Sequence, residues 1–169
     1  DQTSLVSGAR FREAGIANFS GDGPMQHLAA TIDSRAYDAL GLAIAGLDMA
    51  QPLAPDMLKG LYHDLFPRQL RHALGEYFTP DWLAQYLLDA LDYDGSERLL
   101  DPSCGTGTFL ALALRRMPAH LPVSDKLARL SGIDISPLAA LAARANLLLA
   151  LRDELKHNRD DLDLPVLQS

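Results

Sequence analysis

A short apolar segment that ends in an acid and runs into a glycine turn is the strongest constraint on this chain's fold. Residues 98–101 end at Asp101, and the turn that follows contains Gly105 and Gly107 before an apolar helical pattern begins. Glycine allows a sharp turn and lets the backbone approach a ligand closely. The free amide groups of the next helix favour a carboxylate or a phosphate. The segment therefore predicts a strand, a ligand-binding turn and a helix in succession.

The same succession recurs further along the chain. A second predicted strand over 132–135 contains Asp134 and is followed by Ser136 and Pro137, a helix cap and a first helical residue. Helical patterns cover 107–117, 125–130 and 137–151, and a third strand is predicted from Pro165. Alternating strands and helices indicate a parallel sheet with right-handed crossovers. We expect an α/β half-sheet preceded by a helical N-terminal region.

The sequence pattern divides the chain into three parts. Residues 1–24 hold several glycines with weak periodicity and are predicted as an irregular lead-in. Residues 25–74 form a predicted helical region with amphipathic patterns at 28–47 and 58–65. Residues 75–169 contain the predicted strands and the glycine turn.

Apolar spacing also predicts which helix faces are buried. Thr79 and Pro80 have the residue types of an N-cap and a first helical residue. The buried side of the helix that follows is predicted to hold Trp82, Leu83, Tyr86, Leu87, Ala90 and Leu91. The apolar face of the last helix is predicted to hold Leu138, Leu141, Ala142, Ala145, Leu148, Leu149 and Leu151.

Composition excludes several classes of site. The net charge of −7 and the pI near 5.0 fit an ordinary cytoplasmic protein and argue against a broad nucleic-acid-binding surface. A basic cluster of Lys59, Arg68, Arg71 and His72 is either a local nucleic-acid contact or a solvated helix face. The single cysteine, Cys104, excludes an internal disulfide and is interpreted as a buried small hydrophobe. No histidine spacing predicts a metal site, and no apolar run is long enough for a membrane span.

The residues of the glycine turn distinguish between candidate ligands. The dinucleotide fingerprint requires a third glycine where this chain has Leu110, and no Gly-Lys-Ser/Thr tripeptide of a phosphate-binding loop occurs. Asp101 would repel a polyphosphate but attract a ligand with sulfonium and ammonium groups, such as S-adenosylmethionine. Asp134 could accept hydrogen bonds from ribose hydroxyls, and Ile135 offers an apolar surface to an adenine ring. A purely structural glycine turn is the alternative.

Three segments of the chain carry a more specific similarity. They are 75–80 (Gly-Glu-Tyr-Phe-Thr-Pro), 101–110 (Asp-Pro-Ser-Cys-Gly-Thr-Gly-Thr-Phe-Leu) and 132–137 (Gly-Ile-Asp-Ile-Ser-Pro). They resemble motifs X, I and II of the adenine-specific (amino-group) DNA methyltransferases of restriction-modification type, in the order found in that family. Arg144 and Asn146 fit the helix that follows motif II.

The resemblance implies a partial Rossmann-like methyltransferase fold and S-adenosyl-L-methionine as the cofactor. Residues 75–169 would then be the N-terminal part of the cofactor-binding domain. The implied cofactor-binding residues are Glu76, Tyr77, Phe78, Thr79, Pro80, Asp101, Ser103, Gly105, Thr106, Gly107, Asp134 and Ile135. Thr79 and the backbone from Glu76 to Pro80 would hold the methionine end of the cofactor, with Tyr77 or Phe78 as a wall of the pocket. Asp101 would meet the amino group, and the glycine turn would pass under the methionine moiety.

The catalytic tetrapeptide of the resembled family is absent from this sequence. That tetrapeptide, Asn/Asp/Ser-Pro-Pro-Tyr/Phe, binds the target amino group and stacks on the flipped base, and no Pro-Pro occurs here. We therefore expect an N-terminal fragment, inactive alone, of a parent that methylates adenine in DNA. The parent would contact DNA through parts missing here, with a specificity or nuclease domain or subunit as a further partner. An RNA or protein methyltransferase and a non-catalytic assembly module are the alternatives.

Overall fold

Three segments of the chain are described by the computed structural model: residues 9–19, 79–158 and 160–168. Several of the sequence-based predictions fall outside them. These are the helices at 28–47 and 58–65, the basic cluster of Lys59, Arg68, Arg71 and His72, and the site residues Glu76, Tyr77 and Phe78.

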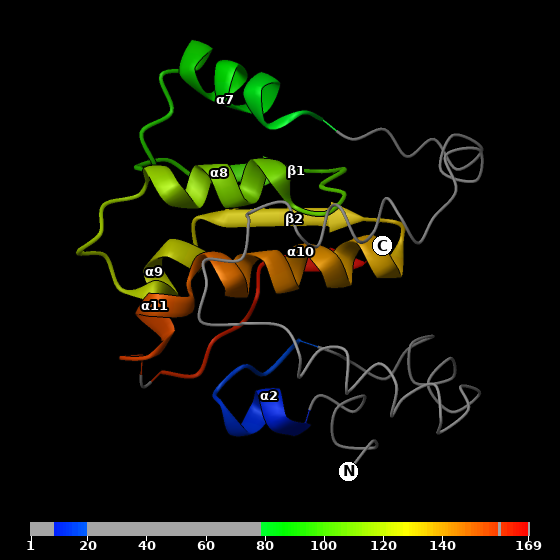
Figure 1. Cartoon of the computed structure of the whole chain (residues 1–169), viewed down its shortest axis with the longest axis vertical. Helices are drawn as coiled ribbons and strands as arrows, with labels where there is room; N and C mark the ends of the chain where they lie inside the picture. The colour runs from blue at the N-terminus through cyan, green and yellow to red at the C-terminus, as the bar shows by residue number, and fades with distance from the viewer. Residues whose placement is uncertain (1–8, 20–78, 159, 169) are drawn as a thin grey trace, which may run out of the picture.

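Three parallel strands form a sheet in the order β1-β2-β3 (Figure 1). The strands are β1 (Leu99–Asp101), β2 (Leu130–Asp134) and β3 (Val166–Gln168). Leu99 lies opposite Leu130 in β2, and Gly132 lies opposite Val166 in β3. The helices are α2 (Ala9–Glu13), α7 (Asp81–Ala90), α8 (Thr108–Arg116), α9 (Val123–Leu127), α10 (Pro137–Ala150) and α11 (Arg152–Leu155). This order confirms the predicted alternation of strands and helices, and it is a partial α/β fold.

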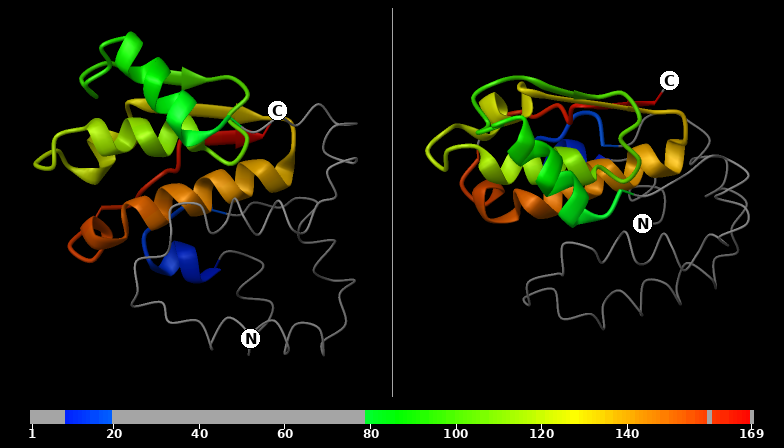
Figure 2. Two further views of the ribbon diagram at one scale, coloured as in Figure 1. Left: turned by 45° about the horizontal axis from the view of Figure 1, so that its top comes forward. Right: turned by 90° about the horizontal axis from the view of Figure 1, so that it is seen from above.

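Helices α8 and α10 contact each other and cover one face of the sheet, and α7 packs on α8 (Figures 1 and 2). Their buried side chains form one apolar cluster with the strands, including Leu110 of α8, Leu147 of α10 and Val166 of β3. The other face of the sheet carries Leu100 and Leu167, which are 61% and 62% exposed. No helix of the described residues covers that face.

The approach of α8 to the sheet depends on a glycine in β2. A Cβ atom added at Gly132 would lie 2.6 Å from Cδ1 of Leu110 and 3.1 Å from Sγ of Cys104. Both side chains are buried, so neither has open space into which it could move. Cys104 is thus the buried small hydrophobe that its sequence context predicts. Burial, with the charges of Asp101 and Asp134, raises the pKa of its thiol to about 12, so the thiolate is not formed at neutral pH.

The predicted buried face of α7 is wrong. Its buried residues are Ala84 and Leu88, whereas Trp82 and Tyr86 are 69% and 64% exposed. Apolar side chains cover more than half of this helix, so spacing alone could not identify the side that meets α8. The predicted cap is also one residue early. Pro80 stands at the N-cap in an extended conformation, and its carbonyl accepts hydrogen bonds from the first turn of the helix.

The predicted face of α10 is largely wrong, although Leu151, just beyond its end, is buried and Leu148 is partly buried against the core. The buried residues of α10 are Ala139, Ala140, Ala143 and Leu147. Almost every position of this helix is apolar, so no single face stands out in the sequence. The small alanines are the buried residues because the helix lies close to the sheet and to the turn after β1, where larger side chains would not fit. The predicted N-terminus is confirmed: Oγ of Ser136 accepts a hydrogen bond from the N–H of Ala139 at 3.3 Å.

Residues 9–19 contain a short helix and contacts with the C-terminal part of the chain. After α2, Ile16 pairs with Leu162 in a parallel bridge. The side chain of Asn18 exchanges two hydrogen bonds with the backbone of Leu164, at 2.9 and 2.7 Å. These partners are separated by about 146 positions, so no local pattern could have predicted the contact. None of the described helices is long and apolar enough to cross a membrane.

The buried face of α7 can be tested by a pair of substitutions. We expect Leu88→Ala to lower the free energy of unfolding by about 2–5 kcal/mol, because Leu88 is only 1% exposed and its loss leaves a cavity. Leu91→Ala is the matched control: Leu91 is 75% exposed, and the change should stay within about 0.5 kcal/mol. Urea denaturation measures both. A larger loss at Leu91 would favour the face predicted from the sequence.

Candidate functional site

Two carboxylates meet at the carboxyl edge of the sheet. Asp101 is the last residue of β1 and Asp134 is the last residue of the neighbouring strand β2. Both are partly buried. In an open parallel sheet, ligands bind outside the carboxyl ends of the strands. The structure therefore brings these two predicted site residues together at the edge where a ligand is expected.

The turn between β1 and α8 has the backbone geometry that its glycines suggest. Gly105 and Gly107 have φ angles of 54° and 83°, in the left-handed region that side chains disfavour. A Cβ atom added at Gly107 would lie 3.1 Å from the Cβ of Ala143 in α10. An atom added at Gly105 would meet no atom of the described residues within 4 Å, so this part of the backbone is open with respect to them. A ligand can therefore approach the chain at Gly105.

Three hydrogen bonds among the described residues join the turn to β2 and α10. The N–H of Cys104 donates to the carbonyl of Ile133 at 2.9 Å, and the N–H of Gly105 donates to Oδ2 of Asp134 at 2.7 Å. From the opposite side, Nδ2 of Asn146 donates to the carbonyl of Thr106 at 2.9 Å. The turn is thus fixed by β2 and by α10, which lie on either side of it.

Asp134 has a structural role that sequence reasoning missed. Its Oδ1 accepts the N–H of Ser136 at 2.8 Å, while Oδ2 accepts the N–H of Gly105. Each carboxylate oxygen can accept a second hydrogen bond, so the side chain can still receive two hydroxyl groups. Asp134 therefore links the glycine turn to the start of α10 and also keeps acceptor capacity for a ligand.

The electrostatics of this edge favour a cation. Partial burial and the nearby charge of Asp134 raise the pKa of Asp101, although the N–H of Ser103, which donates to Oδ1 at 3.1 Å, opposes the shift. An ionised Asp101 is therefore destabilised in the folded protein until a positive group approaches it. The carboxyl pair attracts cations and repels a polyphosphate.

The other predicted site residues are found in different settings. Thr106 is 2% exposed, whereas Ile135, directly after β2, is 79% exposed and available to a flat apolar partner. Ser103 is exposed in the turn. Thr79 is half-buried and Pro80 exposed, just before α7. The sequence analysis did not predict the hydrogen bond of Asn146 to the turn. The one signal for it in the sequence was a polar amide side chain between apolar residues of the helix.

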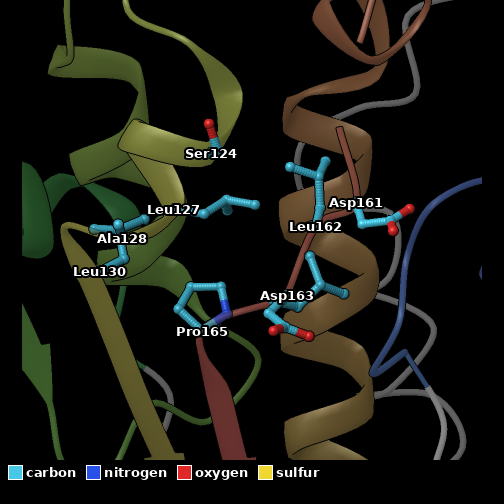
Figure 3. Close-up of a pocket in the computed structure, with 9 residues that line it drawn as sticks. Ser124, Leu127, Ala128, Leu130, Asp161, Leu162, Asp163 and Pro165 are labelled. Carbon is cyan, nitrogen blue, oxygen red and sulfur yellow. The ribbon is translucent and has the colours of Figure 1, made fainter. Parts of the chain in front are cut away.

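A separate cavity of about 280 Å³ lies at the opposite end of the sheet (Figure 3). It is formed by α9 and the segment that leads into β3, with Leu127 and Leu162 facing each other across it. Leu130, the first residue of β2, and Pro165, just before β3, also line it. The cavity is therefore at the amino ends of the strands and is distinct from the edge that carries Asp101 and Asp134.

Comparison with known proteins identifies the family. Residues 56–163 match the model of the N-6 DNA methylase family. The chain belongs to this family. The match includes both strand-end carboxylates and the glycine turn.

Named relatives agree with this assignment. The chain is 31% identical to the adenine-specific methyltransferase PglX of Streptomyces coelicolor, over 61% of this chain and 11% of PglX. It is 28% identical to the type II methyltransferase M.VspI of a Vibrio species, over 68% of this chain and 27% of that protein. The chain thus spans only 11% and 27% of the length of these two relatives.

A solved structure supports the fold. The cryoEM structure of a DrdV–DNA complex superposes with a TM-score of 0.54 and 22% identity, over 86% of this chain and 16% of the other. At this identity the likeness concerns the fold alone.

The two glycines of the turn should differ in their tolerance of a side chain. Gly105→Ala incurs only the cost of a left-handed alanine, about 1–2 kcal/mol of unfolding free energy. Gly107→Ala must also displace Ala143, which adds about 1–3 kcal/mol. Thermal and urea denaturation of the two variants measure the difference. Equal losses would contradict the close approach of the turn to α10.

Removing the charge of Asp101 should stabilise the ligand-free protein at neutral pH. Because the pKa of Asp101 is raised by folding, its ionised form opposes folding above that pKa. The gain from Asp101→Asn should shrink as the pH falls through the native pKa, where the wild-type side chain takes up a proton. Unfolding free energies between pH 4 and 8 test this, with the exposed Asp163→Asn as control. A destabilised Asp101→Asn at pH 7 would refute the expectation.

Proposed function

We propose that residues 75–169 bind S-adenosyl-L-methionine at the carboxyl edge of β1 and β2. The observation that carries the proposal is the pairing of two partly buried carboxylates with a glycine turn whose backbone is open at Gly105. A cation with hydroxyl groups and a flat ring suits this arrangement better than a phosphate-rich ligand. The family match supports the same choice, since N-6 DNA methylases generally use this cofactor.

Each part of the proposed site contacts a different part of the cofactor. Asp101 receives the ammonium group of the methionine end, directly or through a water molecule, and this contact offsets the cost of its ionisation. The turn of Ser103, Gly105, Thr106 and Gly107 runs under the methionine moiety. Asp134 accepts the ribose hydroxyls with its remaining lone pairs.

The remaining contacts complete the site. Ile135 covers one face of the adenine ring, using a side chain that is otherwise exposed. Residues Glu76, Tyr77, Phe78, Thr79 and Pro80 surround the methionine end in this proposal. When bound, the cofactor supplies an electrophilic methyl group.

We further propose that the longer protein is a DNA adenine methyltransferase of a restriction-modification or related phage-defence system. The names of the relatives support this, as PglX is an adenine-specific methyltransferase and M.VspI a type II methyltransferase. DNA would be bound by parts outside these 169 residues, together with a specificity or nuclease domain or subunit. The 169 residues contain no Pro-Pro-Tyr/Phe motif, so we propose that they are inactive alone.

Calorimetric titration with S-adenosyl-L-methionine tests the binding site. We expect Asp101→Ala and Asp134→Ala each to weaken binding about tenfold or more, because a charge-assisted hydrogen bond contributes about 1.5–3 kcal/mol. Asp163→Ala, which removes an exposed carboxylate near the amino end of β3, should bind as the wild type does. Unchanged affinity in both site variants would refute the assignment.

The methylation activity is tested in the longer protein. Asp101→Ala in that protein should abolish transfer of labelled methyl groups to adenine-containing DNA, while RNA and protein acceptors remain unlabelled in the wild type. Normal methylation by the variant would contradict the proposed site. Labelling of RNA or protein instead of DNA would contradict the proposed substrate.

A further inference from the structure

The carbonyl of Thr106 is the central group of the glycine turn, because it lies between the two left-handed glycines. Thr106 is 2% exposed, so its backbone has almost no access to water. The carbonyl accepts a hydrogen bond from Nδ2 of Asn146 at 2.9 Å, from a helix 40 positions away in sequence. A buried carbonyl without such a partner is strongly unfavourable. The orientation of this peptide unit therefore depends on the Asn146 side chain.

Helix α10 supports the turn at a second position on the same face. Ala143 stands three residues before Asn146, so the two side chains are neighbours on the helix surface. Ala143 is fully buried, and its Cβ would lie 3.1 Å from a Cβ added at Gly107. Ala143 limits how closely the turn can approach α10, and Asn146 fixes the direction in which the Thr106 carbonyl points.

Helix α10 is itself held to the sheet by hydrogen bonds at two positions. At its start, α10 is capped by Ser136, whose N–H donates to Asp134. In its middle, the guanidinium of Arg144 donates to the carbonyl of Val166 in β3 at 3.1 and 2.7 Å. In the views of Figures 1 and 2, α10 lies beside α8 along the same face of the sheet. Asn146 is thus presented from a helix with little freedom to shift.

We propose that Asn146 is a positioning residue that holds the glycine turn in its ligand-ready orientation. By fixing the carbonyl of Thr106 toward α10, it leaves the N–H of Gly105 pointing at Asp134 and keeps the backbone at Gly105 open. Its effect on cofactor affinity rests on the proposed function. Its effect on the turn does not depend on the identity of the ligand.

The first test exchanges the donor for an acceptor of the same shape. In Asn146→Asp, an ionised carboxylate would face the Thr106 carbonyl and repel it, whereas a protonated carboxyl could donate to it. We expect the dissociation constant for S-adenosyl-L-methionine to rise at least tenfold at pH 8, relative to wild type at the same pH. The ratio should fall toward one as the pH is lowered to about 4, where an aspartate carboxyl takes up a proton. Asn146→Ala should weaken binding at both pH values to the same degree.

The control variant breaks a similar bond elsewhere. Nδ2 of Asn158 donates to the carbonyl of Asp160 at 2.7 Å on the exposed surface, far along the chain from the turn. Asn158→Asp should leave the affinity ratio near one at both pH values. A ratio near one for Asn146→Asp at pH 8 would overturn the proposal, as would a loss that does not recover on acidification.

The second test needs no ligand. Amide hydrogen exchange at Gly105 and Gly107 should be at least tenfold faster in Asn146→Asp than in the wild type at pH 7. The N–H of Gly132, which donates to the carbonyl of Pro165 at 2.7 Å, should be unchanged and shows that the sheet is intact. Unchanged exchange at both glycines would refute the positioning role. Faster exchange in a chain that binds no S-adenosyl-L-methionine would support that role and contradict the proposed function.

Discussion

The rest of the structure depends on the close contact between the turn after β1 and the middle of strand β2. The contact is possible because residue 132 has no side chain, which leaves room for Leu110 and Cys104 over β2. The backbone of Cys104 is then bonded to Ile133, and Gly105 to Asp134. A side chain at position 132 would lift the start of α8 and move the turn away from both carboxylates. The hydrophobic core and the candidate site therefore share one steric requirement.

Features with a local backbone cause could be predicted from the sequence. Gly105 and Gly107 adopt left-handed torsions because the chain reverses there within a few residues. Ser136 caps α10 as its residue type suggests. A strand before Ser136 was recognisable from its short apolar run, although it was predicted at 132–135 and lies at Leu130–Asp134, where it includes a residue predicted to be helical. Parallel pairing then brings Asp101 and Asp134 to one edge whatever the details of packing. Local turn chemistry and topology were enough to locate the candidate site.

Features set by distant partners could not be predicted in this way. Helix α7 offers apolar side chains over a wide arc, and only contact with α8 determines that Leu88 is buried and Trp82 is not. The pairing of Ile16 with Leu162 joins segments from opposite ends of the chain. The bond from Asn146 to Thr106 requires the exact rotation of α10 about its axis. Hydrophobic periodicity carries no information about any of these contacts.

The charge arrangement explains why such a tightly supported turn would be useful. Burying the ionised Asp101 beside Asp134 opposes folding, and a protein without a ligand at this edge would gain stability by losing the charge of Asp101. A cation that binds at this edge would offset this cost, because the carboxylate of Asp101 is already partly desolvated and the turn beside it is already oriented. Orientation is what the contacts of Ile133, Asp134 and Asn146 provide, since each fixes one peptide unit of the turn. The stability lost at Asp101 and the rigidity of the turn are thus two parts of one preorganised candidate site.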